Sequence, residues 1–188
     1  MENRKKVPLK NKLAYGIGTG GGNVFSQIAA AFLFNYYTDT ALIGAGAIAT
    51  MFLVCRVFDG ITDLLMGGIV DKTSTKLGKA RPWLIASAPL SFLGIVLLMN
   101  VPMGLGENGK LVYAYITYIF MSCIVYTIYG ISNTALLPLM THDKDDSTML
   151  ATFSALGNNI IGLIAGSLIT PLVLNLGWKT SSIILGFA

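Results

Sequence analysis

The chain has 188 residues, of which 54% are hydrophobic and 12% charged, with a formal net charge of +4 and a mean hydropathy of +0.68. A soluble domain is usually about a quarter charged, so this composition excludes an ordinary soluble globular domain and indicates lipid as the solvent. The chain's two cysteines and its one histidine lie far apart in the sequence, which argues against a disulfide framework, a zinc cluster or a histidine-centred catalytic site.

The N-terminal segment, residues 1–12, is polar and basic. The apolar stretch after it is too long for the h-region of a signal peptide and has no small-residue cleavage site before the next charge. We therefore expect a cytoplasmic lead-in to a retained membrane span. Its basic residues are Arg4, Lys5, Lys6, Lys10 and Lys12.

Five long apolar segments follow, and each can cross a bilayer as a tilted helix. A sixth begins near Thr180 and reaches Ala188, but nine residues at about 1.5 Å each cannot cross a hydrocarbon core about 30 Å thick. We expect an all-α, polytopic transmembrane bundle in which residues 1–188 form one domain, truncated within its sixth helix. The five full segments cover residues 13–38, 43–70, 83–101, 111–140 and 149–176, each to within a few residues.

Small residues recur within the first and fifth segments, where they let membrane helices approach closely. Packing accounts for most of them. The run from Gly20 to Asn23 is different, because a glycine cluster inside a span weakens the helix. The glycines concerned are Gly16, Gly18, Gly20, Gly21, Gly22, Gly157, Gly162 and Gly166.

Basic residues are concentrated on alternate connections. If the N-terminus is inside, the connections 71–81 and 141–147 are also inside and carry most of the lysines and arginines, whereas the outside connections hold only Lys110 and Lys179. This distribution satisfies the positive-inside rule, and the two tryptophans fall at the expected interfaces. We expect a multi-pass membrane protein with a cytoplasmic N-terminus.

The second segment carries three charged residues, Arg56, Asp59 and Asp63, in an otherwise apolar run. Spacings of three and four residues put them on one helix face. A charge near the bilayer centre costs about 2.5 kcal/mol or more, so this face needs a polar interior. The two carboxylates and the Thr62 hydroxyl are oxygen ligands for a small cation, Na⁺ or Li⁺, or one carboxylate carries a proton instead. An Arg–Asp bridge that only joins helices is the alternative.

The connection after this segment, residues 67–83, is rich in glycine and charge. This pattern predicts a hinge held by ion pairs, with Asp71 facing basic groups; for the lysines, an ordinary positive-inside loop is the alternative. The expected gating residues are Gly67, Asp71, Lys79 and Arg81.

Four stretches resemble the glycoside–pentoside–hexuronide:cation symporter family, the melibiose permease-like branch of the major facilitator superfamily. The likeness covers nearly the whole chain, and the paired aspartates together with the Gly-Lys-Ala-Arg-Pro-Trp sequence are its most specific part. The stretches are residues 12–23 with 36–39, residues 52–63, residues 67–83, and Tyr126-Thr127 with 135–138 and 141–143.

The resemblance implies a twelve-helix fold of two six-helix halves, of which this chain is the N-terminal one, with the solute site near the midplane between them. It implies cation ligands at Asp59, Asp63, Thr62 and Thr127, and solute contacts at Asn23, Arg56 and Tyr126. The implied partners are a sugar or glycoside, a coupling cation (Na⁺, Li⁺ or H⁺), the lipid bilayer of the bacterial inner membrane, and the missing C-terminal half or a second half-transporter. No catalytic residue, cofactor or nucleic acid is implied.

The sequence also departs from the family pattern. Gly130 occupies an acidic or amide position, Ser132 and Asn133 replace a proline and an aromatic residue, and residues 147–158 lack the usual arginine. The leading expectation is a symporter that works by alternating access. The alternatives are a truncated or non-transporting membrane protein, a symporter of a lipid-like or steroid solute, and, least favoured, a membrane enzyme.

Overall fold

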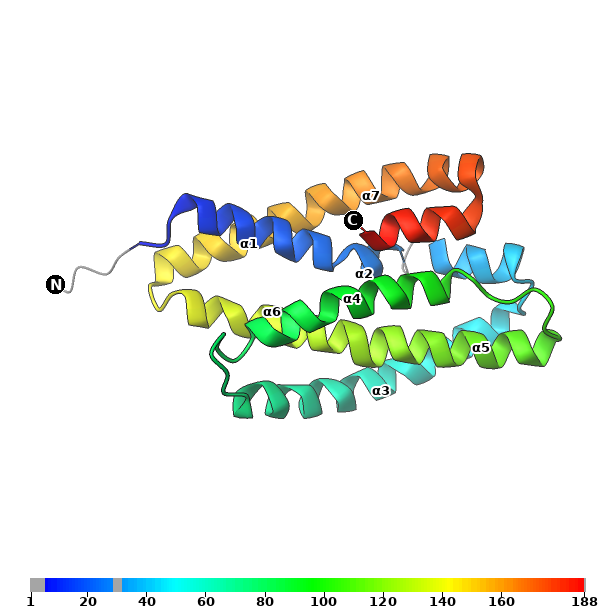
Figure 1. Ribbon diagram of the computed structural model, residues 1–188, viewed down its shortest axis with the longest axis horizontal. Coiled ribbons are helices and arrows are strands. Elements are labelled where there is room, and N and C mark those ends of the chain that lie inside the picture. The colour runs from blue at the N-terminus through cyan, green and yellow to red at the C-terminus, as the bar shows by residue number, and fades with distance from the viewer. Residues whose placement is uncertain (1–5, 29–31, 188) are drawn as a thin grey trace.

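The computed structural model describes residues 6–28 and 32–187 and shows a bundle of helices, with no strand in those ranges. The helices run roughly parallel to the long axis and alternate in direction (Figure 1). Arg4 and Lys5 of the basic lead-in, and Ala188, lie outside the described residues. The elements are α1 (Leu9–Gly22), α2 (Val24–Ile28), η2 (Tyr36–Thr40), α3 (Ala45–Lys72), α4 (Arg81–Leu98), α5 (Glu107–Ile119), η3 (Phe120–Tyr126), α6 (Thr127–Met140) and α7 (Lys144–Phe187).

Within the described residues, three helical stretches are long and apolar enough to cross a membrane: Arg81–Leu98, Glu107–Met140 and Lys144–Gly186. The second joins α5, η3 and α6 into one rod. Helix α3, with 28 residues, is about 42 Å long at 1.5 Å per residue, but its charged face interrupts the apolar run. The all-α bundle is thus confirmed, and the number of spans remains a prediction.

Helix α7 is two helices joined at Gly177, where φ is +74°. Glycine adopts this left-handed conformation without the cost that a Cβ would bring, and it often ends a helix in this way. The chain turns back at this end of the bundle, so that the last residues run antiparallel to the first arm of α7 (Figure 1). The turn lies between the predicted fifth and sixth segments.

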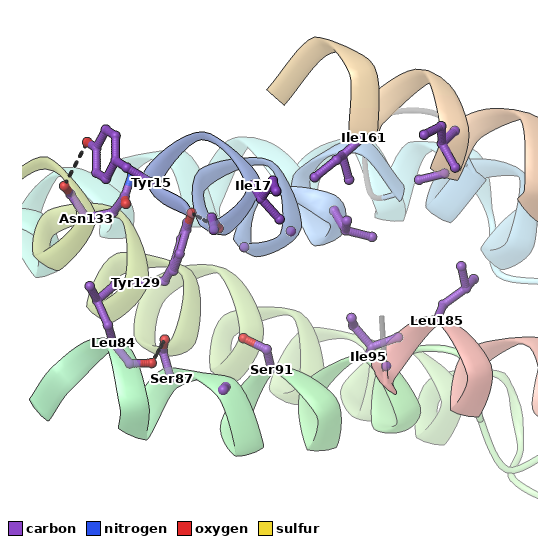
Figure 2. A pocket seen from close by; sticks show the side chains of 18 of the residues that line it. Tyr15, Ile17, Leu84, Ser87, Ser91, Ile95, Tyr129, Asn133, Ile161 and Leu185 are labelled. Carbon is purple, nitrogen blue, oxygen red and sulfur yellow. Dashed lines mark hydrogen bonds between the residues drawn. The ribbon is translucent and has the colours of Figure 1, made fainter. Parts of the chain in front are cut away.

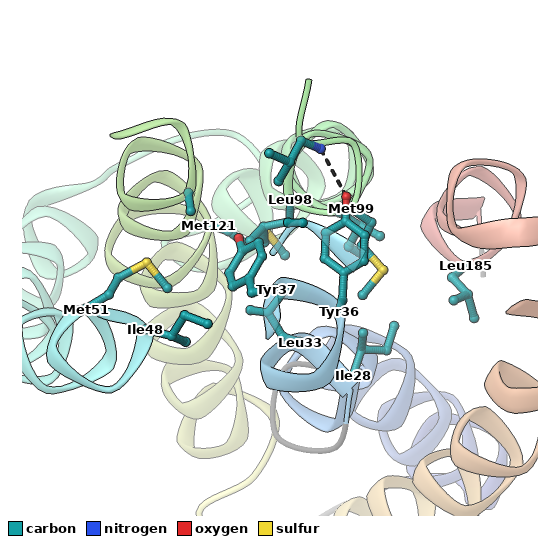
Figure 3. Close-up of a cluster of buried hydrophobic side chains, with 14 of the residues drawn as sticks. Ile28, Leu33, Tyr36, Tyr37, Ile48, Met51, Leu98, Met99, Met121 and Leu185 are labelled. Carbon is teal, nitrogen blue, oxygen red and sulfur yellow. Dashed lines mark hydrogen bonds between the residues drawn. The ribbon is translucent and has the colours of Figure 1, made fainter. Parts of the chain in front are cut away.

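The largest cluster of buried side chains lies where η2, α3, α4 and η3 meet (Figure 3). Tyr36 and Tyr37 are at its centre, with exposed fractions of 1% and 0%. The Val101 amide donates a hydrogen bond to the Tyr36 hydroxyl oxygen at 3.1 Å, and the Trp178 ring lies 4.9 Å from the Tyr36 ring between centroids. Because Trp178 belongs to the part of α7 after Gly177, this cluster joins that second helix to the rest of the bundle's core.

Helices α1 and α7 pack backbone to backbone. A Cβ on Gly16 would lie 2.5 Å from the Phe153 carbonyl oxygen, and a Cβ on Gly20 would overlap the carbonyl oxygen of Gly157. Only glycine permits this approach, which explains Gly16, Gly20 and Gly157.

A buried ion pair joins α1 to α7 at the end of the bundle nearest the N-terminus. Lys12 Nζ lies 2.6 Å from Asp146 Oδ1, and the Val7 amide donates to Asp146 Oδ2 at 2.7 Å. Hydrogen bonds from Lys12 and Val7 stabilise the charged carboxylate and lower the pKa of Asp146 below its ordinary value.

This pair predicts a pH-dependent contribution to stability. The pKa of Asp146 is lower in the folded state than in the unfolded state. The ion pair therefore stabilises the fold above the ordinary aspartate pKa of about 3.9, and this stabilisation is lost as pH falls through the folded-state pKa. We expect Asp146→Asn to lower the unfolding temperature by several degrees at pH 7, and the difference from wild type to shrink below about pH 4. The double variant Lys12→Met/Asp146→Met should recover stability, since no buried charge is left unpaired. A pH-independent difference would contradict this role.

Candidate functional site

The charged face of α3 opens into a cavity of about 460 Å³ between α3, η3 and α6. Both predicted cation-binding aspartates line it, together with Arg56, Tyr126 and Thr127. The spacing argument for one shared face is therefore confirmed. The other lining residues are Ser26, Phe34, Phe52, Tyr118, Ser122, Gly130, Ile131 and Thr134.

Asp59 is the most enclosed of the three charged groups. Its side chain is 20% exposed, and Ser122 Oγ lies 3.0 Å from Oδ1 and 3.2 Å from Oδ2, so the hydroxyl donates to the carboxylate. Arg56 Nη1 is 3.9 Å from Asp59 Oδ2, but the guanidinium is 85% exposed. A pair so loose and so open contributes little to stability, which argues against the interpretation of this pair as a simple join between helices.

Asp63 lies one turn further along α3 and is exposed, with no hydrogen bond or ion pair to any residue in the described ranges. Thr62 Oγ1 is 3.4 Å from Thr127 Oγ1 and so links α3 to α6. Thr62 itself does not line the cavity, whereas Thr127 does. The four predicted cation ligands thus lie on two facing helices, with Asp63 still open to a ligand.

Asn23 is linked to the charged cavity by a hydrogen bond with Tyr126. It stands between α1 and α2, and its Oδ1 accepts a hydrogen bond from the Tyr126 hydroxyl at 2.9 Å. Its Nδ2 donates to the Thr19 carbonyl oxygen at 3.0 Å. Asn23 therefore positions a lining residue while lying outside the lining itself.

Ser122 was missed by the sequence analysis. It belongs to η3, a π-helical segment inside the α5–α6 rod, and such segments often occur at functional sites because they redirect side chains. Both Ser122 and Tyr126 are in η3 and face the cavity. Their spacing of four residues within an apolar run was the available signal.

We expect Ser122→Ala to weaken cation binding by about tenfold, because loss of a hydrogen bond that orients a ligand carboxylate typically costs 10–100-fold in affinity. The measurement is the cation concentration that gives half of the rise in unfolding temperature. Ser167→Ala is a matched control, since its hydroxyl is exposed on α7 and donates only to the Leu163 carbonyl. Equal affinities in the two variants would remove Ser122 from the site.

The expected gating residues lie at the end of the bundle where α3 and α4 meet. Gly67 and Asp71 belong to α3, which continues to Lys72 because Ile69 and Val70 extend its apolar pattern. The connection is held by the Thr75 hydroxyl, which donates to the Gly78 carbonyl at 2.7 Å. Trp83 Nε1 donates to Thr73 Oγ1 at 2.9 Å. Within the described part of the chain, neither ion pair involves Asp71, Lys79 or Arg81. The connection is therefore held by hydrogen bonds and not by the ion pairs that the sequence predicted.

The positions that depart from the family pattern lie in two different places. Gly130 lines the charged cavity, and a Cβ there would meet nothing within 4 Å. Asn133 instead lines a second, largely apolar cavity of about 660 Å³ between α1, α4, α6 and α7, where Tyr15 donates to its carbonyl at 3.3 Å (Figure 2). Only the Gly130 change therefore alters the charged cavity.

The atoms that could bind a cation in the charged cavity are carboxylate and hydroxyl oxygens, which suit a hard cation. Across the residues that are described, no group of three or more histidine, cysteine, aspartate or glutamate side chains is placed to hold a metal ion. A carboxylate pair facing a polar cavity on a membrane helix is the arrangement that ion-coupled transporters use.

These features describe a helical bundle with a carboxylate face on an internal cavity. Residues 14–188 match the family described as MFS/sugar transport protein, and the chain belongs to that family. The resemblance to major facilitator symporters is thus confirmed. It is a family of membrane transporters, in agreement with the expectation that the chain is not an enzyme.

Several symporters and carriers are similar to this chain. The inner membrane symporter YicJ of Escherichia coli is 33% identical over 89% of this chain and 36% of its own length. The glucuronide carrier protein homolog of the same organism is 33% identical over 91% of this chain and 37% of its own length. The isoprimeverose transporter of Lactiplantibacillus pentosus is 29% identical over 95% of this chain and 37% of its own length. The chain thus spans 36–37% of the length of these relatives.

Proposed function

We propose that this chain is the N-terminal six-helix half of a secondary active transporter that couples a cation gradient to uptake of a sugar or glycoside by alternating access. The observation that carries the proposal is the Asp59–Asp63 face of α3, which lines a cavity inside a membrane bundle. The similarity to a glucuronide carrier homolog and an isoprimeverose transporter supports a sugar or glycoside as the solute. A second half would close the cavity, since such sites lie between two halves.

The cation is Na⁺, Li⁺ or H⁺, bound at Asp59 and Asp63 with help from Thr62 and Thr127. Ser122 orients the Asp59 carboxylate, while the exposed Asp63 completes the ligand set when the cation enters. Cation binding favours the solute-binding state, and the solute favours cation binding by the same factor.

The solute is bound beside the cation. Arg56 offers hydrogen-bond donors to sugar hydroxyls. The Tyr126 hydroxyl, whose own proton is donated to Asn23, offers an oxygen that accepts from them. Phe52 and Tyr118, with ring centroids 4.9 Å apart, give the cavity an apolar wall that suits the C–H face of a sugar ring. A cavity with apolar walls and a few convergent polar groups is typical of small-molecule sites.

The gate is the α3–α4 connection with Gly67, Asp71, Lys79 and Arg81. The N-terminus lies in the cytoplasm, as the positive-inside rule predicts. Ion pairs of these residues then form with the second half in one state of the cycle and break in the other.

The test is the unfolding temperature of the detergent-purified chain in Na⁺, Li⁺ or choline chloride at constant ionic strength, over a range of pH. Ligand that binds only the native state raises stability by about 2.7 kcal/mol at one hundred times its Kd. A rise specific to Na⁺ or Li⁺ identifies a metal-coupled site. If no metal cation has an effect and Asp59→Asn removes a pH dependence that Asp146→Asn leaves in place, the coupling ion is a proton. If none of these has an effect, the cation site is wrong.

A further inference from the structure

A third cavity, of about 730 Å³, lies at the end of the bundle nearest the N-terminus, away from the charged face of α3. It is formed by the residues that lead into α1, by the α3–α4 connection with the start of α4, and by the end of α6. In Figure 1 these three segments gather at the end where the label N stands. The candidate span that contains α4 begins here and the one that contains α6 ends here. A bilayer crossed by these helices would have its headgroups at the level of the cavity.

One side of this cavity is cationic. Lys6, Lys76, Lys79 and Arg81 all line it, and no acidic residue does so in the described ranges. All four side chains are exposed. Neither of the two ion pairs within those ranges includes any of them. The charge of Lys6 does act on Asp146 and helps to lower the pKa of that carboxyl. Lys76, Lys79 and Arg81 form no ion pair in those ranges, and three neighbouring cations of this kind attract an anion.

The geometry favours phosphate as that anion. Arg81 is the first residue of α4, so its guanidinium, which can bind phosphate through two parallel hydrogen bonds, lies beside a helix N-terminus. Lys76 and Lys79 flank it on the connection, whose turn is fixed by Gly78 at φ +92°. A phosphate diester placed here meets three cationic side chains.

The lining also has an apolar part. Leu139 and Leu77 belong to it with exposed fractions of 57% and 52%, together with Met140 at the end of α6. A free phosphate ion would leave this surface in water. A phospholipid covers it with its acyl chains while its headgroup meets the cations.

We propose that this cavity binds an anionic phospholipid of the membrane, with the headgroup phosphate held by Lys76, Lys79 and Arg81 and the acyl chains lying along Leu139 and Met140. The lipid braces the α3–α4 connection against the end of α6. The proposal does not depend on which solute or ion is bound, because none of these residues lines the charged cavity. It shares Lys79 and Arg81 with the proposed gate.

Native mass spectrometry of the detergent-purified 188-residue chain tests the proposal by titration with dioleoyl phosphatidylglycerol. Phosphatidylcholine of the same chain length is the neutral-headgroup comparison, and glycerol 3-phosphate and inorganic phosphate are the lipid-free ones. We expect the phosphatidylglycerol complex to form at least tenfold more tightly than the phosphatidylcholine complex. The triple variant Lys76→Gln/Lys79→Gln/Arg81→Gln should lose about a hundred-fold in affinity.

The matched control removes the same charge elsewhere, through Lys72→Gln, Lys144→Gln and Lys179→Gln, whose exposed side chains do not line the cavity. It should bind phosphatidylglycerol within threefold of wild type. The charge-retaining variant Lys76→Arg/Lys79→Arg/Arg81→Lys should also keep binding, which separates loss of charge from loss of folding.

Three results would overturn the proposal. Equal loss in the control and the cavity triple would show attraction to the whole surface rather than a site. Equal binding of phosphatidylglycerol and phosphatidylcholine would remove the role of charge. Glycerol 3-phosphate or inorganic phosphate that competes at the concentration of the lipid would identify a soluble phosphate compound as the ligand.

Discussion

Replacement of Asp59 by Asn is expected to abolish the cation-dependent rise in unfolding temperature. Asp59 is the enclosed member of the pair, held from both carboxylate oxygens by Ser122. Asn keeps the shape but removes the charge that binds the cation, so about 2.7 kcal/mol of stabilisation at one hundred times the Kd is lost. For a chain of 150–250 residues this corresponds to roughly 5–10 °C. In choline, the variant and the wild type should unfold within a few degrees of each other.

Asp145→Asn is the matched control. Asp145 is an exposed carboxylate in the first turn of α7 that does not line the cavity, so its removal should leave the cation-dependent rise unchanged. In a transporter that contains this half, Asp59→Asn should also abolish gradient-driven accumulation of the solute. A wild-type cation response in Asp59→Asn would refute the site assignment, whatever the family.

The sequence predicted the charged face well because its signal is local. Charges at spacings of three and four residues share a helix face whatever surrounds the helix, and their cost in lipid requires a polar cavity. Arg56, Asp59 and Asp63 therefore line one cavity, as expected. The turn at Gly177 was also predictable from a local signal, since a glycine that ends an apolar run favours a turn.

Contacts between helices could not be predicted in this way. The bonds Ser122–Asp59 and Tyr126–Asn23 join residues 63 and 103 positions apart, and only the packing of the helices sets their register. The π-helical segment η3 also changes which side chains of the α5–α6 rod face the neighbouring helices, and the sequence there gives no sign of an irregular helix. For the same reason the sequence could not distinguish Gly130, inside the charged cavity, from Asn133, which faces the apolar one.

The glycines of α1 also differ in ways that the sequence does not show, and this leads to the second large expected effect. Gly20→Ala should lower the free energy of unfolding by about 1–3 kcal/mol, the usual cost of overpacking a close contact. Its Cβ would overlap the Gly157 carbonyl oxygen and lie 2.6 Å from Ile161 Cδ1. Helices α1 and α7 would have to separate along their closest contact. The measurement is the unfolding temperature in detergent, which should fall by at least 2–4 °C.

Gly21→Ala, one position further on, is the control, because a Cβ there meets nothing within 4 Å. The better helix propensity of alanine then acts alone and should raise stability by up to about 1 kcal/mol. The two neighbouring substitutions are identical in chemistry and differ only in the helix face that they occupy. Opposite signs would therefore establish the close packing of α1 on α7. A stabilised Gly20→Ala would show that the two helices lie further apart than the structure places them.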